Sequence, residues 1–121
     1  MAKKILAVDD SKTMRDMVTF TLRKAGFDVM EAIDGQKALD AMTGSKFDLI
    51  ITDINMPVMD GITLIKNVRT GSSHRAVPIL ILTTESDDAK KAAGKSAGAT
   101  GWLVKPFNPD KLVELVNRVC P

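Results

Sequence analysis

The chain has 121 residues, of which 45% are hydrophobic and 26% charged, as is typical of one globular domain. Seventeen Lys and Arg against fifteen Asp and Glu leave a net charge of +2, too small an excess to favour nucleic acid or an anionic membrane surface. No apolar run approaches the roughly 20 residues that span a bilayer. The chain has a single cysteine, Cys120, which excludes an internal disulfide. With only one cysteine and one histidine, it also lacks the ligands of a Cys/His zinc module. We expect a single monomeric domain over residues 1–121, located in the cytoplasm.

Short apolar runs alternate with longer segments of helical period along the chain. In order, we predict a strand at 5–8, a helix at 14–25 closed by Gly26, a strand at 28–32 and a short helix at 38–44. A strand at 47–52, a helix at 62–68 and a strand at 79–82 follow. The helix at 89–99 is rich in alanine and interrupted by Gly94, so we expect it to be among the less stable segments. A strand at 102–104 precedes the last helix, which Asn108 caps, with Pro109 at its first position.

Five strands alternating with five helices predict an α/β fold in which right-handed crossovers join parallel strands. The runs at 5–8, 47–52 and 79–82 are apolar throughout, as a sheet covered by helices on both faces requires. Residues 28–32 alternate in polarity, which indicates an edge strand. We therefore expect a five-stranded, flavodoxin-like sheet of order 2-1-3-4-5, with a site at the carboxyl ends of the strands, where the chain reverses direction.

Polar residues follow four of the predicted strands. Asp9 and Asp10 follow the first strand, Asp53 the third, Thr83 the fourth and Lys105 the fifth. A single Asp in such a place is most often a helix cap or turn former, but the whole set is matched to one chemical task. Three neighbouring carboxylates repel one another unless a cation compensates their charge. Mg²⁺ prefers oxygen ligands and is often bound by carboxylate and phosphate oxygens together. A lysine and a hydroxyl can donate hydrogen bonds to the other phosphate oxygens. The set of residues therefore predicts an aspartate that accepts a phosphoryl group.

The motifs around these residues resemble a known family. They are Val-Asp-Asp-Ser at 8–11, Asp-Ile-Asn-Met-Pro at 53–57 with Met-Asp-Gly at 59–61, Thr-Thr at 83–84 and Lys-Pro-Phe at 105–107. In this order they are similar to the receiver domains of bacterial response regulators, over about residues 4–119. Because no output domain accompanies them, the chain resembles the single-domain chemotaxis regulators within that family.

The resemblance implies a role for each residue of the predicted site. Asp53 is the expected phosphoacceptor, and no general base is needed because a carboxylate is ionised at neutral pH. The Asp10 and Asp53 side chains and the backbone carbonyl of Asn55 are the expected Mg²⁺ ligands, while Asp9 holds a metal-bound water. Lys105 is expected to pair with Asp53 and then with a phosphoryl oxygen.

The resemblance also implies a conformational switch and residues that set the rate of dephosphorylation. Thr83 turns its hydroxyl to the phosphoryl group, and an aromatic residue of the fifth strand, here Trp102, fills the space that Thr83 leaves. Many relatives have Tyr or Phe at this place, and an indole is bulkier and offers only an N–H donor. Asn55 and Glu85 occupy positions that tune the loss of the phosphoryl group to water. The resemblance implies a cis peptide before Pro106, although a trans proline that simply ends the strand is also compatible with the sequence.

The expected partners are proteins. A histidine kinase would donate the phosphoryl group, and an output protein, such as a flagellar motor switch component, would bind the face formed by the helix at 89–99, the strand at 102–104 and the helix at 109–119. The lysines of this face, Lys90, Lys91 and Lys95, either form an ordinary solvated surface or contact an acidic partner. We expect chemotaxis signalling without enzymatic turnover.

Other functions remain open from the residues alone. The chain could be a phosphate sink, a phosphorelay intermediate or a pseudo-receiver that binds partners without phosphorylation. A phosphohydrolase with an aspartyl intermediate would need a second Asp two residues after the nucleophile, where Asn55 stands. His74 lies in a polar loop, and we expect it to be exposed.

Overall fold

In the computed structural model, five helices and five strands alternate over the described residues, which are 2–71, 73–84 and 87–121. The strands, listed here with the bounds that the structure gives them, are β1 (Lys4–Val8), β2 (Asp28–Ala32), β3 (Leu49–Thr52), β4 (Ile79–Thr83) and β5 (Gly101–Val104). The helices are α1 (Lys12–Lys24), α2 (Gly35–Gly44), α3 (Gly61–Thr70), α4 (Asp88–Ala97) and α5 (Pro109–Val119). Each predicted element is confirmed, with ends displaced by a few residues.

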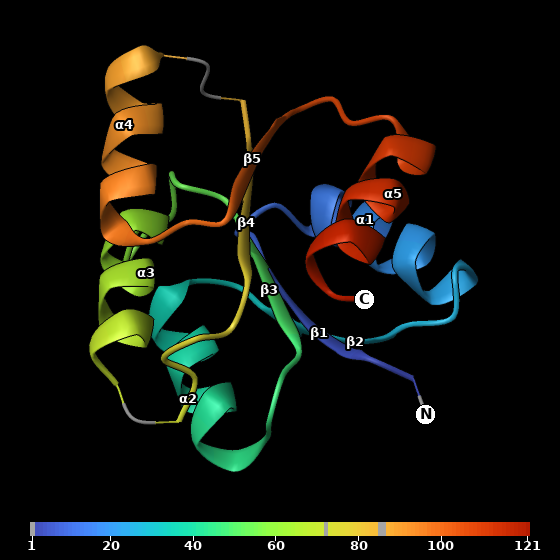
Figure 1. Cartoon of the computed structure of the whole chain (residues 1–121), viewed down its shortest axis with the longest axis horizontal. Coiled ribbons are helices and arrows are strands. Elements are labelled where there is room, and N and C mark those ends of the chain that lie inside the picture. The colour runs from blue at the N-terminus through green and yellow to red at the C-terminus, as the bar shows by residue number, and fades with distance from the viewer. Residues whose placement is uncertain (1, 72, 85–86) are drawn as a thin grey trace.

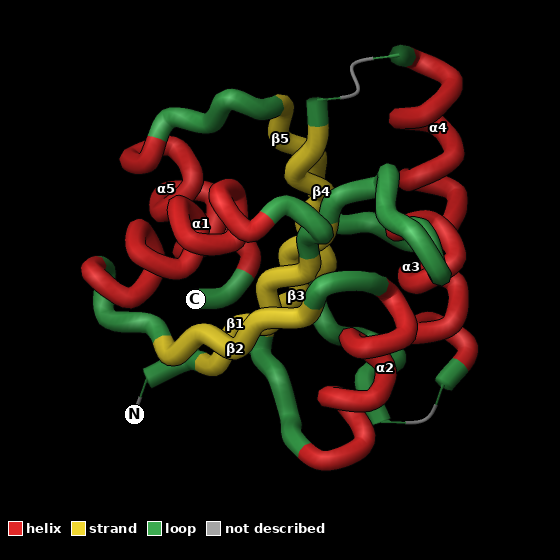
Figure 2. The backbone as a smooth tube through the Cα atoms, turned by 180° about the vertical axis from the view of Figure 1, so that it is seen from behind, coloured by secondary structure: helices red, strands yellow, loops and turns green. Residues whose placement is uncertain are grey.

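The strands form one parallel sheet of order β2-β1-β3-β4-β5, as predicted. Figures 1 and 2 show α1 and α5 on one face of the sheet and α2, α3 and α4 on the other. Successive strand residues point to opposite faces, so Ile5 packs with the α1 and α5 side chains while Leu6 packs on the other side. This explains why the central strands are apolar throughout. No helix in the described part of the chain is long and apolar enough to cross a membrane.

Local sequence sets the helix ends. The side chains of Ser11, Asp34, Asp60 and Asn108 each accept a hydrogen bond from a backbone N–H of the first helical turn, as N-cap residues do. The expected N-cap and first-turn proline of α5 are confirmed.

Helix α4 differs from its predicted form. Gly94 does not interrupt the helix, which runs to Ala97 and ends at Gly98, a residue with a φ of 113°. Gly94 is the only buried residue of α4, and a Cβ there would lie 2.7 Å from Ile81 Cδ1 and 3.1 Å from Trp102 Cζ3. The glycine is therefore the point at which α4 rests on β4 and β5. A helix with so little buried surface has little to stabilise it, in keeping with the expected low stability.

The prediction that His74 is exposed is wrong. The residue is 6% exposed, and its Nε2 accepts a hydrogen bond from the backbone N–H of Phe47 at 3.1 Å. The Ser73 hydroxyl lies 2.8 Å from Nδ1. A backbone N–H inside the protein needs an acceptor, and the imidazole supplies it. Sequence reasoning treated His74 as a loop residue, whereas its role is to tie that loop to the segment before β3.

Candidate functional site

The carboxyl ends of β1 and β3 bring the predicted acids together. Asp9 directly follows β1, and Asp53 directly follows β3, where its backbone N–H donates to the Val8 carbonyl at 3.0 Å. Carboxylate oxygens of Asp9, Asp10 and Asp53 all lie within 4.8 Å of one another. We call these three residues the acidic cluster. Asp10 is exposed, whereas Asp9 and Asp53 are buried, so the cluster opens to solvent on the Asp10 side.

Lys105 joins the acidic cluster from the end of β5. Its Nζ donates to Asp9 Oδ2 at 2.6 Å and to Asp53 Oδ2 at 2.9 Å, and its side chain is only 8% exposed. Burial by itself would lower the pKa of Lys105, but the hydrogen bonds and charges of the two carboxylates outweigh burial and raise it. The expected pairing with Asp53 is therefore confirmed, and pairing with Asp9 is an addition that the sequence did not predict.

The backbone holds this lysine in register with the site. Its N–H donates to the Thr83 carbonyl at 2.8 Å, which ties the end of β5 to the end of β4. The peptide bond between Lys105 and Pro106 is cis, in agreement with the expectation from the family resemblance. Thr83 itself is fully buried as the last residue of β4.

The second oxygen of each buried carboxylate also accepts a hydrogen bond. Asp9 Oδ1 accepts the Ser11 N–H at 2.8 Å, and Asp53 Oδ1 accepts the Ile54 N–H at 2.6 Å. These bonds hold each carboxylate in one orientation, as a site for in-line chemistry requires. Asn55 follows at the exposed rim, two residues after Asp53.

The charge of the site favours a divalent cation. Three carboxylates and one ammonium leave an excess of two negative charges in a partly buried space. The donors are all oxygen atoms, which suits Mg²⁺ and not a soft metal. The residues present therefore fit the metal that the sequence predicts.

Trp102 lies on β5, three residues before Lys105, paired in register with Ile81 of β4. Its side chain is half-buried and packs against the core between the sheet and α2, α3 and α4. The role of Trp102 in the predicted switch stays a prediction. Glu85, the second predicted tuning residue, lies outside the described residues.

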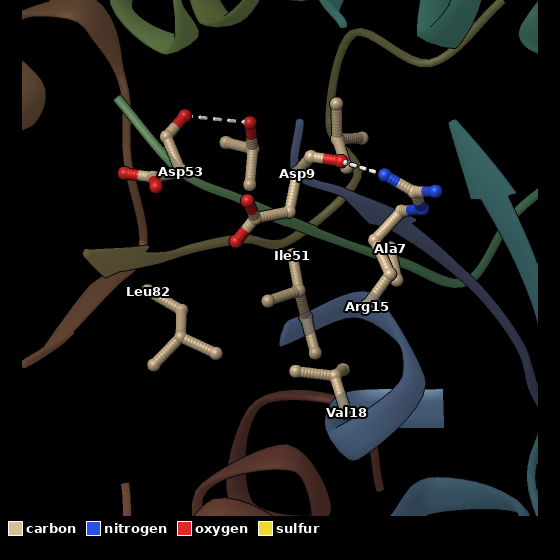
Figure 3. Close-up of a pocket in the computed structure, with 9 residues that line it drawn as sticks. Ala7, Asp9, Arg15, Val18, Ile51, Asp53 and Leu82 are labelled. Atoms are coloured by element: carbon tan, nitrogen blue, oxygen red, sulfur yellow. Dashed lines mark hydrogen bonds between the residues drawn. The ribbon is translucent and has the colours of Figure 1, made fainter. Parts of the chain in front are cut away.

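One residue near the site was missed by sequence reasoning. Arg15 of α1 donates from Nη1 to the Asp9 main-chain carbonyl at 2.7 Å (Figure 3). Its Nε donates to Glu31 Oε1 at 3.3 Å. Its sequence signal was a basic residue early in α1, where the helix dipole disfavours positive charge.

Comparisons with known proteins agree with this geometry. Residues 5–117 match the response regulator receiver domain family. Chemotaxis protein CheY1 of Helicobacter pylori is 44% identical over 120 residues, covering 96% of this chain and 95% of that protein. The structure of chemotaxis protein CheY4 of Vibrio cholerae superposes with a TM-score of 0.94 at 51% identity, covering 98% of this chain and 99% of that one.

A third relative bears on the acidic cluster. The receiver domain of a sensor histidine kinase from Pseudomonas aeruginosa, 28% identical with a TM-score of 0.92 and coverage of 99% and 98%, has a magnesium ion coordinated in its active-site cleft. The family match spans nearly the whole chain, and the similar structures share its sheet order and overall shape. The chain therefore belongs to the response regulator receiver domains of two-component signalling systems.

Proposed function

We propose that this receiver domain accepts a phosphoryl group on Asp53 from a histidine kinase, in a Mg²⁺-dependent reaction, and thereby changes its affinity for a protein partner in chemotaxis. The observation that carries the proposal is the Lys105 ammonium shared between Asp9 and Asp53 beside an exposed third carboxylate. A purely structural ion pair needs one acid for one lysine. The surplus of acids at the rim instead suits a cation and a phosphoryl group.

The metal would be held by the Asp10 and Asp53 carboxylates and the Asn55 carbonyl, with Asp9 contacting a bound water. When bound, Mg²⁺ supplies positive charge that neutralises the phosphoryl oxygens during transfer. Lys105 supplies a second positive charge beside Asp53, and this charge is already in place in the structure. Fixed charges of this kind need no reorganisation when the reaction occurs.

In the transfer step, a carboxylate oxygen of Asp53 attacks the phosphorus of a phosphohistidine on the donor. The new O–P bond forms as the N–P bond breaks, and the histidine nitrogen keeps the electron pair and takes up a proton. Lys105 then donates to a phosphoryl oxygen, and the Thr83 hydroxyl turns to another. The reaction consumes one donor for each receiver, so the chain acts as a signal carrier and not as a turnover enzyme.

The output would arise because phosphorylation adds about −1.5 to −2 charges and three acceptor oxygens at one place. Movement of Thr83 toward the new group would leave space for Trp102, which changes the surface formed by α4, β5 and α5. On that surface a cavity of about 240 Å³ is lined by residues that include Lys91, Lys95 and Trp102. Two ammonium groups beside an indole suit an acidic partner segment with an apolar anchor, such as part of a flagellar motor switch component in the cytoplasm.

The test is phosphorylation by a small phosphodonor such as acetyl phosphate with Mg²⁺, followed by intact mass. We expect a gain of about 80 Da, one phosphoryl group, in the wild type and none in Asp53→Asn. Asp60→Asn is the matched control, because Asp60 is the exposed N-cap of α3 and Asn caps a helix equally well. A wild-type protein that gains no mass would refute the proposal and leave a pseudo-receiver as the function.

A second measurement tests the switch. Trp102 is the only tryptophan, so the fluorescence reports on the surroundings of this one side chain, where β5 meets α4. We expect phosphorylation to change this fluorescence in the wild type, and the change to be absent in Asp53→Asn. In Thr83→Ala we expect the mass gain to persist while the fluorescence change is reduced. Equal fluorescence changes in the wild type and in Thr83→Ala would contradict the proposed coupling.

A further inference from the structure

We propose that Arg15 is a positioning residue for the metal site, which fixes the peptide between Asp9 and Asp10 and so aims the Asp10 carboxylate into the acidic cluster. This inference rests on the proposed function, because it concerns the Mg²⁺ that phosphotransfer requires. Arg15 does not touch the carboxylates. It acts through the main chain to which they are attached.

The bond from Arg15 is made at the place where the strand ladder stops. The Asp9 N–H still continues the sheet by donating to the Ala32 carbonyl at 3.1 Å. The carbonyl of the same residue instead accepts Arg15 Nη1 at 2.7 Å. Since a peptide unit is planar, holding the Asp9 carbonyl also fixes the direction in which the chain enters Asp10.

Asp10 depends on this main-chain contact more than its neighbours do. The Asp9 carboxylate is held by Ser11 and Lys105, and the Asp53 carboxylate by Ile54 and Lys105. Within the described part of the chain, no hydrogen bond or ion pair holds the exposed Asp10 carboxylate. Its position is therefore set by the backbone, which Arg15 holds at the Asp9 carbonyl and the Asp9 carboxylate holds at the Ser11 N–H.

Arg15 is itself held rigidly. Its side chain is only 13% exposed, and its Nε donates to Glu31 of the edge strand β2. Figure 3 shows the guanidinium reaching from α1 toward the Asp9 main chain, beside a pocket that Val18 and Ile51 also line. A planar guanidinium held at two points has little freedom to turn, which a flexible lysine at this place would have.

Charge and position predict opposite effects when Arg15 is removed. Loss of a cation near three carboxylates would strengthen Mg²⁺ binding by simple electrostatics. Loss of a positioning contact would weaken it, because groups that orient metal ligands typically change metal affinity by about 10- to 100-fold. The sign of the change therefore separates the two roles.

The experiment measures the Mg²⁺ dissociation constant of Arg15→Met by calorimetric titration, together with thermal unfolding. Arg23→Met is the matched control, because Arg23 also lies on α1 and also donates to a main-chain carbonyl, that of Val29 at 3.0 Å, but away from the acidic cluster. We expect the dissociation constant to rise about tenfold in Arg15→Met and to stay within about twofold of the wild type in Arg23→Met. At saturating Mg²⁺ we expect the phosphorylation rate of Arg15→Met to recover to within about twofold of the wild type, because Asp53 and Lys105 are unchanged.

An Arg15→Met dissociation constant that is unchanged or lower would overturn the inference while leaving the proposed function intact. An equal rise in Arg23→Met would also overturn it, because the effect would then be general loosening of α1. If Arg15→Met does not fold, Arg15→Lys takes its place, and the same rise of several-fold is expected because Lys lacks the two-point fork. Failure of the wild type to bind Mg²⁺ would refute the proposed function and this inference together.

Discussion

Acidification should destabilise this protein through its single histidine. His74 is buried, and its Nε2 can accept from the Phe47 N–H only while that nitrogen carries no proton. The neutral ring must then carry its proton on Nδ1, where it donates to the Ser73 hydroxyl. Burial, and next the charge of Lys46, lower the pKa of His74. Folding therefore favours the neutral imidazole.

The sign and size of the effect follow from these contacts. The folded pKa lies below the unfolded value of 6.5, so the stabilisation is complete above 6.5 and is lost as the pH falls through the folded pKa. Protonation would turn Nε2 into a donor that faces the buried Phe47 N–H. Leaving a buried backbone donor without an acceptor costs about 1–3 kcal/mol.

The assay is urea unfolding at a series of pH values from about 8 to about 5, for the wild type and for His74→Gln. The Gln carbonyl can accept the Phe47 N–H but does not titrate, so the carboxylates contribute equally to both proteins. We expect the wild type to lose about 1–2 kcal/mol more than His74→Gln over this range, because a group with an unfolded pKa of 6.5 can lose at most about 2 kcal/mol by pH 5. Parallel stability curves for the two proteins would refute the reasoning.

Three substitutions near the phosphoacceptor test other parts of the structure by unfolding measurements. Gly61→Ala should destabilise the protein by about 3 kcal/mol, because a Cβ there would overlap the Asp53 carbonyl oxygen. Gly44→Ala is the control: a Cβ at Gly44 would meet no atom within 4 Å, so stability should change by less than about 1 kcal/mol. Equal effects of the two substitutions would contradict this account. Val58→Asn should stabilise the protein by about 1 kcal/mol, because Val58 is 82% exposed and has a φ of 68°, a conformation that strains a β-branched residue. Val58 is the central residue of a γ-turn, in which the Met59 N–H donates to the Pro57 carbonyl at 2.7 Å. A loss of stability would argue against backbone strain at Val58. Lys105→Gln should lower the stability by about 3 kcal/mol without Mg²⁺, because two buried carboxylates lose their cation. Mg²⁺ should then raise the melting temperature of the variant more than that of the wild type. An equal rise would show that the lysine does not compensate the charge of the carboxylates.

The sequence by itself determined the elements and the sheet order. Apolar periodicity is a local property, so the strands, the helices and the edge position of residues 28–32 could all be predicted. Parallel strands place their carboxyl ends at one rim, and this rule predicted that Asp9, Asp53 and Lys105 would lie at the same edge of the sheet. Family resemblance added the cis peptide before Pro106, which the residues alone left open.

Only the tertiary structure decided how side chains from distant segments share partners. Lys105 divides its ammonium between Asp9 and Asp53, Arg15 holds the Asp9 carbonyl, and His74 turns inward to the Phe47 N–H. Each of these contacts depends on the direction in which a side chain leaves its own element and on which backbone groups remain without a sheet or helix partner. Neither quantity is carried by hydrophobic pattern or spacing, because both arise only when the packed layers bring the segments together.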